Sequence, residues 1–196
     1  MSQYYFLVAS LPLLSYEDRD AAEPAEFLET IGGHLTDADL RIVARATIEP
    51  PPADESSADH TRGNETLRAW TEYERGLRNA LVRLRAGKRL VDPARFVRTG
   101  PSGSEGSDSV EIGEAVRDAW TQESPLSAED ALNRARWSFL DELEVGHFFD
   151  LDLIIVYFLK LQILARRRAY DRKEGEAQFV EITRRIMNDY YQERSE

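Results

Sequence analysis

The stretch LDLIIVYFLKLQIL, residues 151–164, decides the fold. Its apolar side chains would cover every side of a helix for about three turns, and a helix that is apolar all round is buried by neighbours on every face. Asp152, Lys160 and Gln162 interrupt the stretch, which is also shorter than the roughly 20 apolar residues of a membrane-spanning helix. We therefore expect a helix from 151 to about 173 at the centre of a helical core.

The long stretch that begins at Glu65 has the strongest amphipathic pattern. Its apolar residues recur every three or four positions, which places them on one face of a helix: Leu67, Trp70, Tyr73, Leu77, Leu81 and Leu84. Glu74 and Arg78 are four residues apart and are expected to pair on its surface. Gly87 is the predicted end of this helix.

Start and stop signals place the other helices. Pro24 suits a first helical turn, and Thr36 and Ser127 each precede an acid by three residues, as in a capping box. Further helices are expected over 110–120, with Trp120 facing inward, and over 176–191; Gly146 ends the helix that Ser127 opens. Residues 4–14 fit either a helix kinked at Pro12 or a short buried strand.

These patterns predict an all-α fold, an irregular bundle of about seven helices in two units. Residues 1–98 would form an N-terminal unit that contains a linker at 49–64, where three prolines precede acidic and serine residues. Residues 99–108, rich in Gly, Pro and Ser, would form a flexible linker. Residues 109–196 would form the C-terminal unit.

The charge is unevenly distributed. The net charge is −11, yet residues 62–98 carry 10 basic and 4 acidic groups between two acidic regions. An acidic chain is a poor match for nucleic acid, because phosphate contacts supply most of that affinity. The basic helix is better suited to a protein partner, and its candidate partner-binding residues are Arg75, Arg78, Arg83, Arg85 and Arg89.

No convincing catalytic centre can be assembled from the residue types present. There is no cysteine, and the three histidines lie far apart without metal-binding spacing. The one dense group of carboxylates is Asp141, Glu142, Glu144, Asp150 and Asp152. Such a group can bind a divalent metal, but acids at helix ends commonly just complement the helix dipole. We predict no enzyme activity, no metal and no cofactor.

Three stretches resemble known proteins. YYFLVASLP at 4–12 and WTEYERGLRN at 70–79 resemble a small bacterial family encoded among V-type ATPase genes. IIVYFLKLQI at 154–163 is similar to a buried helix of the C/d subunit of V-type ATPases. The C/d subunit is longer, with three helical units where this chain has room for two, and Leu161 stands where that family has a glutamate.

The resemblance implies a non-catalytic, C/d-like part of the V-type ATPase that couples the central rotor shaft to the membrane ring in proton or sodium transport. Its partners would be other V-type ATPase subunits, with no nucleic acid and no membrane insertion. The protein would be cytoplasmic, held through the ATPase at the inner face of the plasma membrane. The alternatives are a free-standing helical adaptor or assembly factor, a metal-dependent hydrolase that uses the acidic cluster, and an RNA binder.

Overall fold

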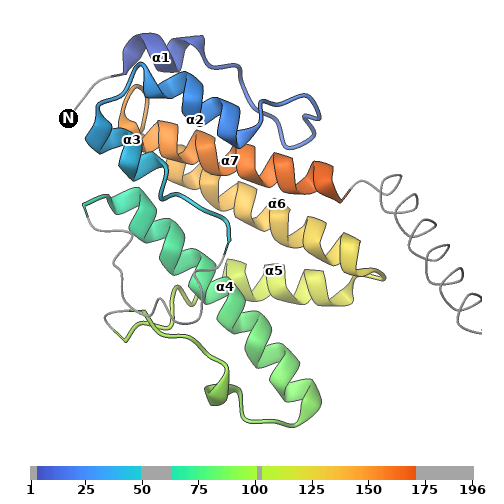
Figure 1. Cartoon of the computed structure of the whole chain (residues 1–196). Helices are drawn as coiled ribbons and strands as arrows, with labels where there is room; N and C mark the ends of the chain where they lie inside the picture. The colour runs from blue at the N-terminus through green and yellow to red at the C-terminus, as the bar shows by residue number, and fades with distance from the viewer. Residues whose placement is uncertain (1–3, 50–62, 101–102, 171–196) are drawn as a thin grey trace, which may run out of the picture.

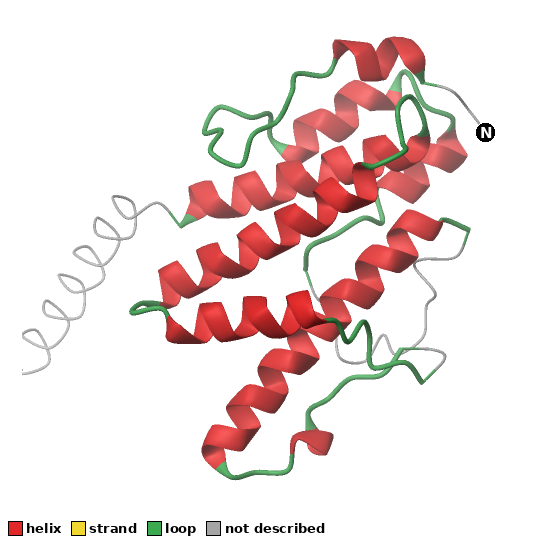
Figure 2. Cartoon of the chain, turned by 180° about the vertical axis from the view of Figure 1, so that it is seen from behind, coloured by secondary structure: helices red, strands yellow, loops and turns green. Residues whose placement is uncertain are grey.

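The computed structural model describes residues 4–49, 63–100 and 103–170. All regular structure in these residues is helical, so the predicted all-α fold is confirmed. Seven α-helices and one 3-10 helix follow one another along the described chain (Figures 1 and 2). They are α1 (Tyr5–Ser10), α2 (Pro24–Gly32), α3 (Asp37–Val43), α4 (Glu65–Arg89), η1 (Pro93–Arg95), α5 (Val110–Thr121), α6 (Pro125–Glu144) and α7 (Leu151–Ala169).

Helix α7 is the centre of the bundle, as its sequence predicts. It contacts α2, α3, α4 and α6, and α6 runs beside it in the opposite direction (Figure 1). Seven of its apolar side chains are buried, with no exposed surface: Ile154, Ile155, Val156, Leu159, Leu161, Ile163 and Leu164. One hydrophobic core includes these residues together with buried residues of α2, α4, α5 and α6.

Several predicted helix boundaries are confirmed. Pro24 is the first residue of α2. The Thr36 hydroxyl accepts the backbone N–H of Asp39 and so caps α3. Gly146 has a positive φ of 92° just after α6 ends. The ambiguous N-terminal stretch forms the short helix α1 rather than a strand.

Other boundaries differ from the prediction. Helix α4 continues through Gly87 to Arg89, and Leu90 takes the left-handed conformation that ends it. Helix α6 begins at Pro125, and the Ser124 hydroxyl, not that of Ser127, accepts the capping N–H. A helix ends where its last backbone N–H and C=O groups find other partners. For α4 and α6 that position lies three residues from the predicted signals, Gly87 and Ser127.

The last predicted elements also differ in part. Helix α7 ends at Ala169, four residues before the predicted end. Trp120 is 42% exposed, and Ala119 is buried in its place. The helix predicted over 176–191 and most of the linker predicted over 49–64 lie outside the described residues.

The segment that follows residue 102 lies directly against α4. The Ser107 N–H donates to the Glu72 carbonyl at 2.9 Å, and the Asn79 side chain donates to the Glu105 carbonyl at 2.7 Å. A Cβ atom at Gly76 would overlap the Ser107 carbonyl, and one at Gly106 would lie 2.6 Å from the Glu72 carbonyl oxygen. The sequence predicts a flexible linker here, but these residues are fixed to α4 by hydrogen bonds and a close backbone contact.

Candidate functional site

The arginines of α4, predicted to bind a partner, fall into two groups. The first group serves the protein's own packing. The Arg75 guanidinium contacts the Glu72 carboxylate at 2.5 Å. Arg78 donates to the Glu74 carboxylate at 2.9 Å and to the Ile48 carbonyl at 2.8 Å, so it joins α4 to the chain after α3. The predicted pairing of Glu74 with Arg78 is confirmed, but Glu74 is buried instead of lying on the surface.

The second group lies toward the C-terminal end of α4. Arg83 pairs with Glu105 of the segment fixed to the helix. Arg85 and Arg89 are exposed, and neither has an ion pair within the described chain. The predicted set is therefore not one continuous binding surface, and only its last members remain available to a partner.

A network of buried charges joins α4 to α6. The Arg136 Nε donates to the Glu74 carboxylate at 2.6 Å, and its Nη1 donates to Asn133 at 2.9 Å and to Glu129 at 3.3 Å. Burial lowers the pKa of Arg136, but the nearby acidic groups, Glu74 foremost and then Glu129, together outweigh this and raise it. Because each charge in this network has a partner, it fixes how the two helices meet without leaving a free acid or base.

The five clustered carboxylates do not converge on one point. Asp141 and Glu144 both contact the amino group of Lys160, at 2.7 Å for Asp141, and Glu142 is exposed. The amino group of Lys160, whose residue is only 6% exposed, also lies 5.4 Å from the Trp137 ring centre. The first half of the cluster thus neutralises a buried lysine between α6 and α7.

The second half of the cluster gathers around His147. The His147 Nδ1 lies 2.7 Å from Asp150, and potential ligand atoms of His147, Asp150 and Asp152 lie within 4.8 Å of one another. A metal ion could be held there, but each carboxylate already has a structural partner. Asp150 accepts the N–H of Leu153 and caps α7, and Asp152 accepts from the Asn64 amide at 2.8 Å. The acidic cluster on which the hydrolase alternative depends does not form one site, because Glu142 is exposed and Glu144 pairs with Lys160.

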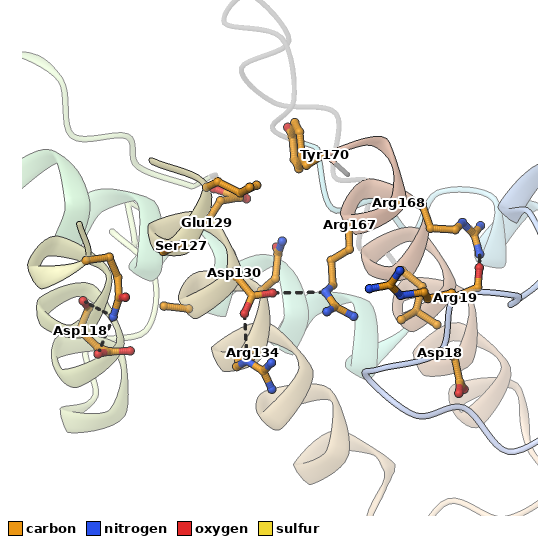
Figure 3. Close-up of a pocket in the computed structure, with 15 residues that line it drawn as sticks. Asp18, Arg19, Asp118, Ser127, Glu129, Asp130, Arg134, Arg167, Arg168 and Tyr170 are labelled. Carbon is orange, nitrogen blue, oxygen red and sulfur yellow. Dashed lines mark hydrogen bonds and ion pairs between the residues drawn. The ribbon is translucent and has the colours of Figure 1, made fainter. Parts of the chain in front are cut away.

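A cavity of about 830 Å³ lies among the loop at 18–19, the end of α5, the first half of α6 and the end of α7 (Figure 3). Its lining is mostly charged. Asp130 lies between Arg134, at 3.0 Å, and Arg167, at 3.3 Å. The cavity is large enough to hold a ligand, but the charged side chains that line it mostly pair with one another.

The charges of this cavity also hold the N-terminal loop. The Tyr16 hydroxyl donates to Asp130 at 2.9 Å, and the Arg167 guanidinium lies 3.9 Å from the centre of the Tyr16 ring. Arg168 pairs with Glu23 at 2.6 Å. Burial raises the pKa of the Tyr16 hydroxyl, and the Asp130 carboxylate adds to this effect. Arg167 and Arg168, in the last turn of α7, thus attach this loop to the bundle.

A group of large apolar side chains at one end of the molecule is exposed. We define the aromatic end as Tyr5, Phe6, Val145, Phe148 and Phe149, which belong to α1 and to the α6–α7 connection. Phe6 is 88% exposed and Phe148 is 70% exposed. Val145, Phe148 and Phe149 were not among the residues predicted to bind, although three large apolar residues in one helix connection are a signal that the sequence offers.

Comparisons with known proteins give a family but no function. A family model described as a protein of unknown function (DUF2764) matches residues 57–190. The matched range contains all of α4, α5, α6 and α7, including both sides of the buried charge network. No curated protein and no solved structure matches. Among the described helices, none is both long enough and apolar enough to cross a membrane.

Proposed function

The chain belongs to the family of proteins of unknown function DUF2764, and we propose that it serves as a non-catalytic subunit or accessory protein of a V-type ATPase. In this role it would act as a C/d-like coupling part between the central rotor shaft and the membrane ring. It would be cytoplasmic, and it would reach the inner face of the plasma membrane through its partners. The specific link to the V-type ATPase rests on the three stretches of sequence resemblance.

The observation that supports this proposal best is that the buried and half-buried charged side chains pair between elements. The buried network at Glu74 and Arg136, the pairs of Lys160 and the arginines of the cavity all join one helix or loop to another. Such pairs, together with a close-packed core around α7, favour a body that transmits force with little compression. The large exposed side chains of the aromatic end provide a surface for partners.

The test is affinity purification of a tagged full-length chain from native membranes, with identification of the recovered proteins. The proposal predicts that shaft or ring subunits of a rotary ATPase are recovered in near-equal amounts with the chain. Recovery of no rotary ATPase subunit would overturn it.

A second measurement separates a subunit from an assembly factor. The ATPase is purified through a tag on one of its other subunits, and the chain is sought in the mature complex. A permanent subunit is present there. A chain found only with incomplete complexes would favour the assembly factor.

A further inference from the structure

Specific contacts hold the aromatic end in place. The Tyr5 ring lies 4.5 Å from the Phe149 ring, centre to centre, and the Tyr4 N–H donates to the Phe149 carbonyl at 2.6 Å. The Tyr4 hydroxyl donates to the carboxylate of Asp39 in α3. These contacts join α1, α3 and the α6–α7 connection, which Figure 1 shows gathered at the same end of the bundle. The exposed rings of Phe6 and Phe148 thus project from a defined frame.

The same end is strongly acidic. The segments 4–10, 34–40 and 141–152 contain no lysine and no arginine. Their acids are Asp37, Asp39, Asp141, Glu142, Glu144, Asp150 and Asp152. Of the described lysines and arginines, Lys160 contacts this group, and its amino group is already held by Asp141 and Glu144; His147 lies against Asp150. The three segments that meet at the aromatic end thus carry seven carboxylates, which we call the acidic rim, and no lysine or arginine.

We propose that the aromatic end binds a basic amphipathic helix of a partner protein. Large aromatic side chains are the usual anchors of protein interfaces, and an amphipathic helix presents apolar residues along one side. Lysines or arginines beside that apolar face would meet the carboxylates of the rim, which gives both attraction and orientation. The chemistry of the surface thus specifies both the apolar and the charged part of its partner.

Two other occupants match the surface less well. An anionic membrane would be repelled by the acidic rim. A second copy could offer the basic C-terminal end of α4, where Leu90 is 94% exposed. That head-to-tail contact would leave one free end on each copy and would propagate unless it closed into a ring. Binding of a partner helix involves neither repulsion by the acidic rim nor closure into a ring.

The experiment measures binding of a fluorescent leucine–lysine peptide, about 18 residues or roughly five helical turns long, by anisotropy. The chain is compared with the double variant Phe6→Ser/Phe148→Ser. The matched control is Phe96→Ser, which removes a half-exposed ring far along the chain from the aromatic end. We expect the double variant to bind about tenfold more weakly, and the control to bind as the unaltered chain does. A leucine–glutamate peptide should not bind, and added salt should weaken the leucine–lysine complex.

Several results would overturn the inference. They are absence of peptide binding, equal binding by the double variant, equal loss in the Phe96→Ser control, or unfolding of the double variant in far-UV circular dichroism. Binding of the unaltered chain to vesicles of anionic lipid through the same two phenylalanines would assign the surface to a membrane. If the molecular mass in solution rises with protein concentration, and the double variant stays monomeric, the surface would be assigned to contact with a second copy.

This inference is independent of the proposed ATPase role, because the peptide assay contains no part of the ATPase. A failed peptide assay leaves the affinity purification from membranes unaffected. A failed purification leaves the measured affinity of the surface unaffected.

Discussion

Replacing Glu74 with glutamine removes the negative charge at the centre of the buried network. The Glu74 carboxylate accepts from Arg136 at 2.6 Å and from Arg78 at 2.9 Å, and Arg136 is only 4% exposed. After the substitution, Glu129 at 3.3 Å is the remaining carboxylate beside Arg136. The glutamine amide also presents a donor toward an arginine. We expect a loss of about 3–5 kcal/mol in the free energy of unfolding, the usual cost of removing one partner of a buried ion pair.

This loss can be measured by denaturant unfolding followed by far-UV circular dichroism, with the midpoint and slope fitted together. For a chain of this size it corresponds to a fall of about 6–20 °C in Tm. The matched control is Arg68→Gln on the same helix, which breaks the exposed pair with Glu65 at 3.2 Å. That exposed pair is expected to contribute about 0–1 kcal/mol.

The double replacement Glu74→Leu/Arg136→Met tests the physical reason. Removing both charges leaves no unpaired charge at the buried position 136, and the partly buried Arg78 keeps its hydrogen bond to the Ile48 carbonyl. The double variant should therefore be more stable than Glu74→Gln alone. The reasoning is refuted if Glu74→Gln costs no more than Arg68→Gln. It is also refuted if the second substitution adds its own full penalty to the first.

Three further predictions concern packing, backbone and pH. Leu159→Ala, at a side chain with no exposed surface, should cost about 2–5 kcal/mol in denaturant unfolding, because a cavity remains in the core. Gly106→Ala should lower Tm more than Gly103→Ala does. Both glycines have positive φ, but only at Gly106 would the new Cβ meet α4. Equal losses of Tm would refute the close contact. Burial raises the pKa of the Asp130 carboxyl, but the hydrogen bonds from Tyr16 and Arg134 outweigh it and hold that pKa below its usual range. The folded-state pKa is thus lower than the unfolded one, so the stabilisation is present above about pH 4 and is lost as pH falls further. The difference in unfolding free energy between the chain and Asp130→Asn should therefore shrink from about pH 6 to about pH 3, and a constant difference would contradict this.

Local sequence was sufficient for the elements whose signals are local. The apolar stretch of α7 has no polar face, so burial on all sides was the available solution. Pro24 and Thr36 mark helix starts through the backbone geometry and the hydrogen bonds of their own first turns. The two helix starts depend on residues within one helical turn, the burial of α7 depends on its own apolar stretch, and the structure has all three where the sequence predicts them.

The start of α6 was predicted at the wrong residue. Ser127 was favoured as a cap because Asp130 follows it, but Asp130 is engaged by Tyr16, Arg134 and Arg167 instead. The Ser124–Pro125 pair was the better local signal and was available in the sequence.

The candidate site was the hardest part to predict. Arg136 is 62 positions from Glu74, and Phe149 meets Tyr5 across almost the whole described chain. Nothing in helical spacing reports a pair at such a separation. Composition did reveal the acidic and basic regions, but only the structure shows that the carboxylates divide between Lys160 and His147.

The close contact of Gly106 and Ser107 with α4 has a consequence for anyone who engineers this protein. A glycine- and serine-rich stretch usually suggests a safe place for an epitope tag or a protease site. Here Gly106 and Ser107 lie against the backbone of α4, the Ser107 amide donates to the Glu72 carbonyl, and the Glu105 carbonyl accepts from the Asn79 side chain. An insertion at this position would separate the chain from its helix, so a tag belongs elsewhere.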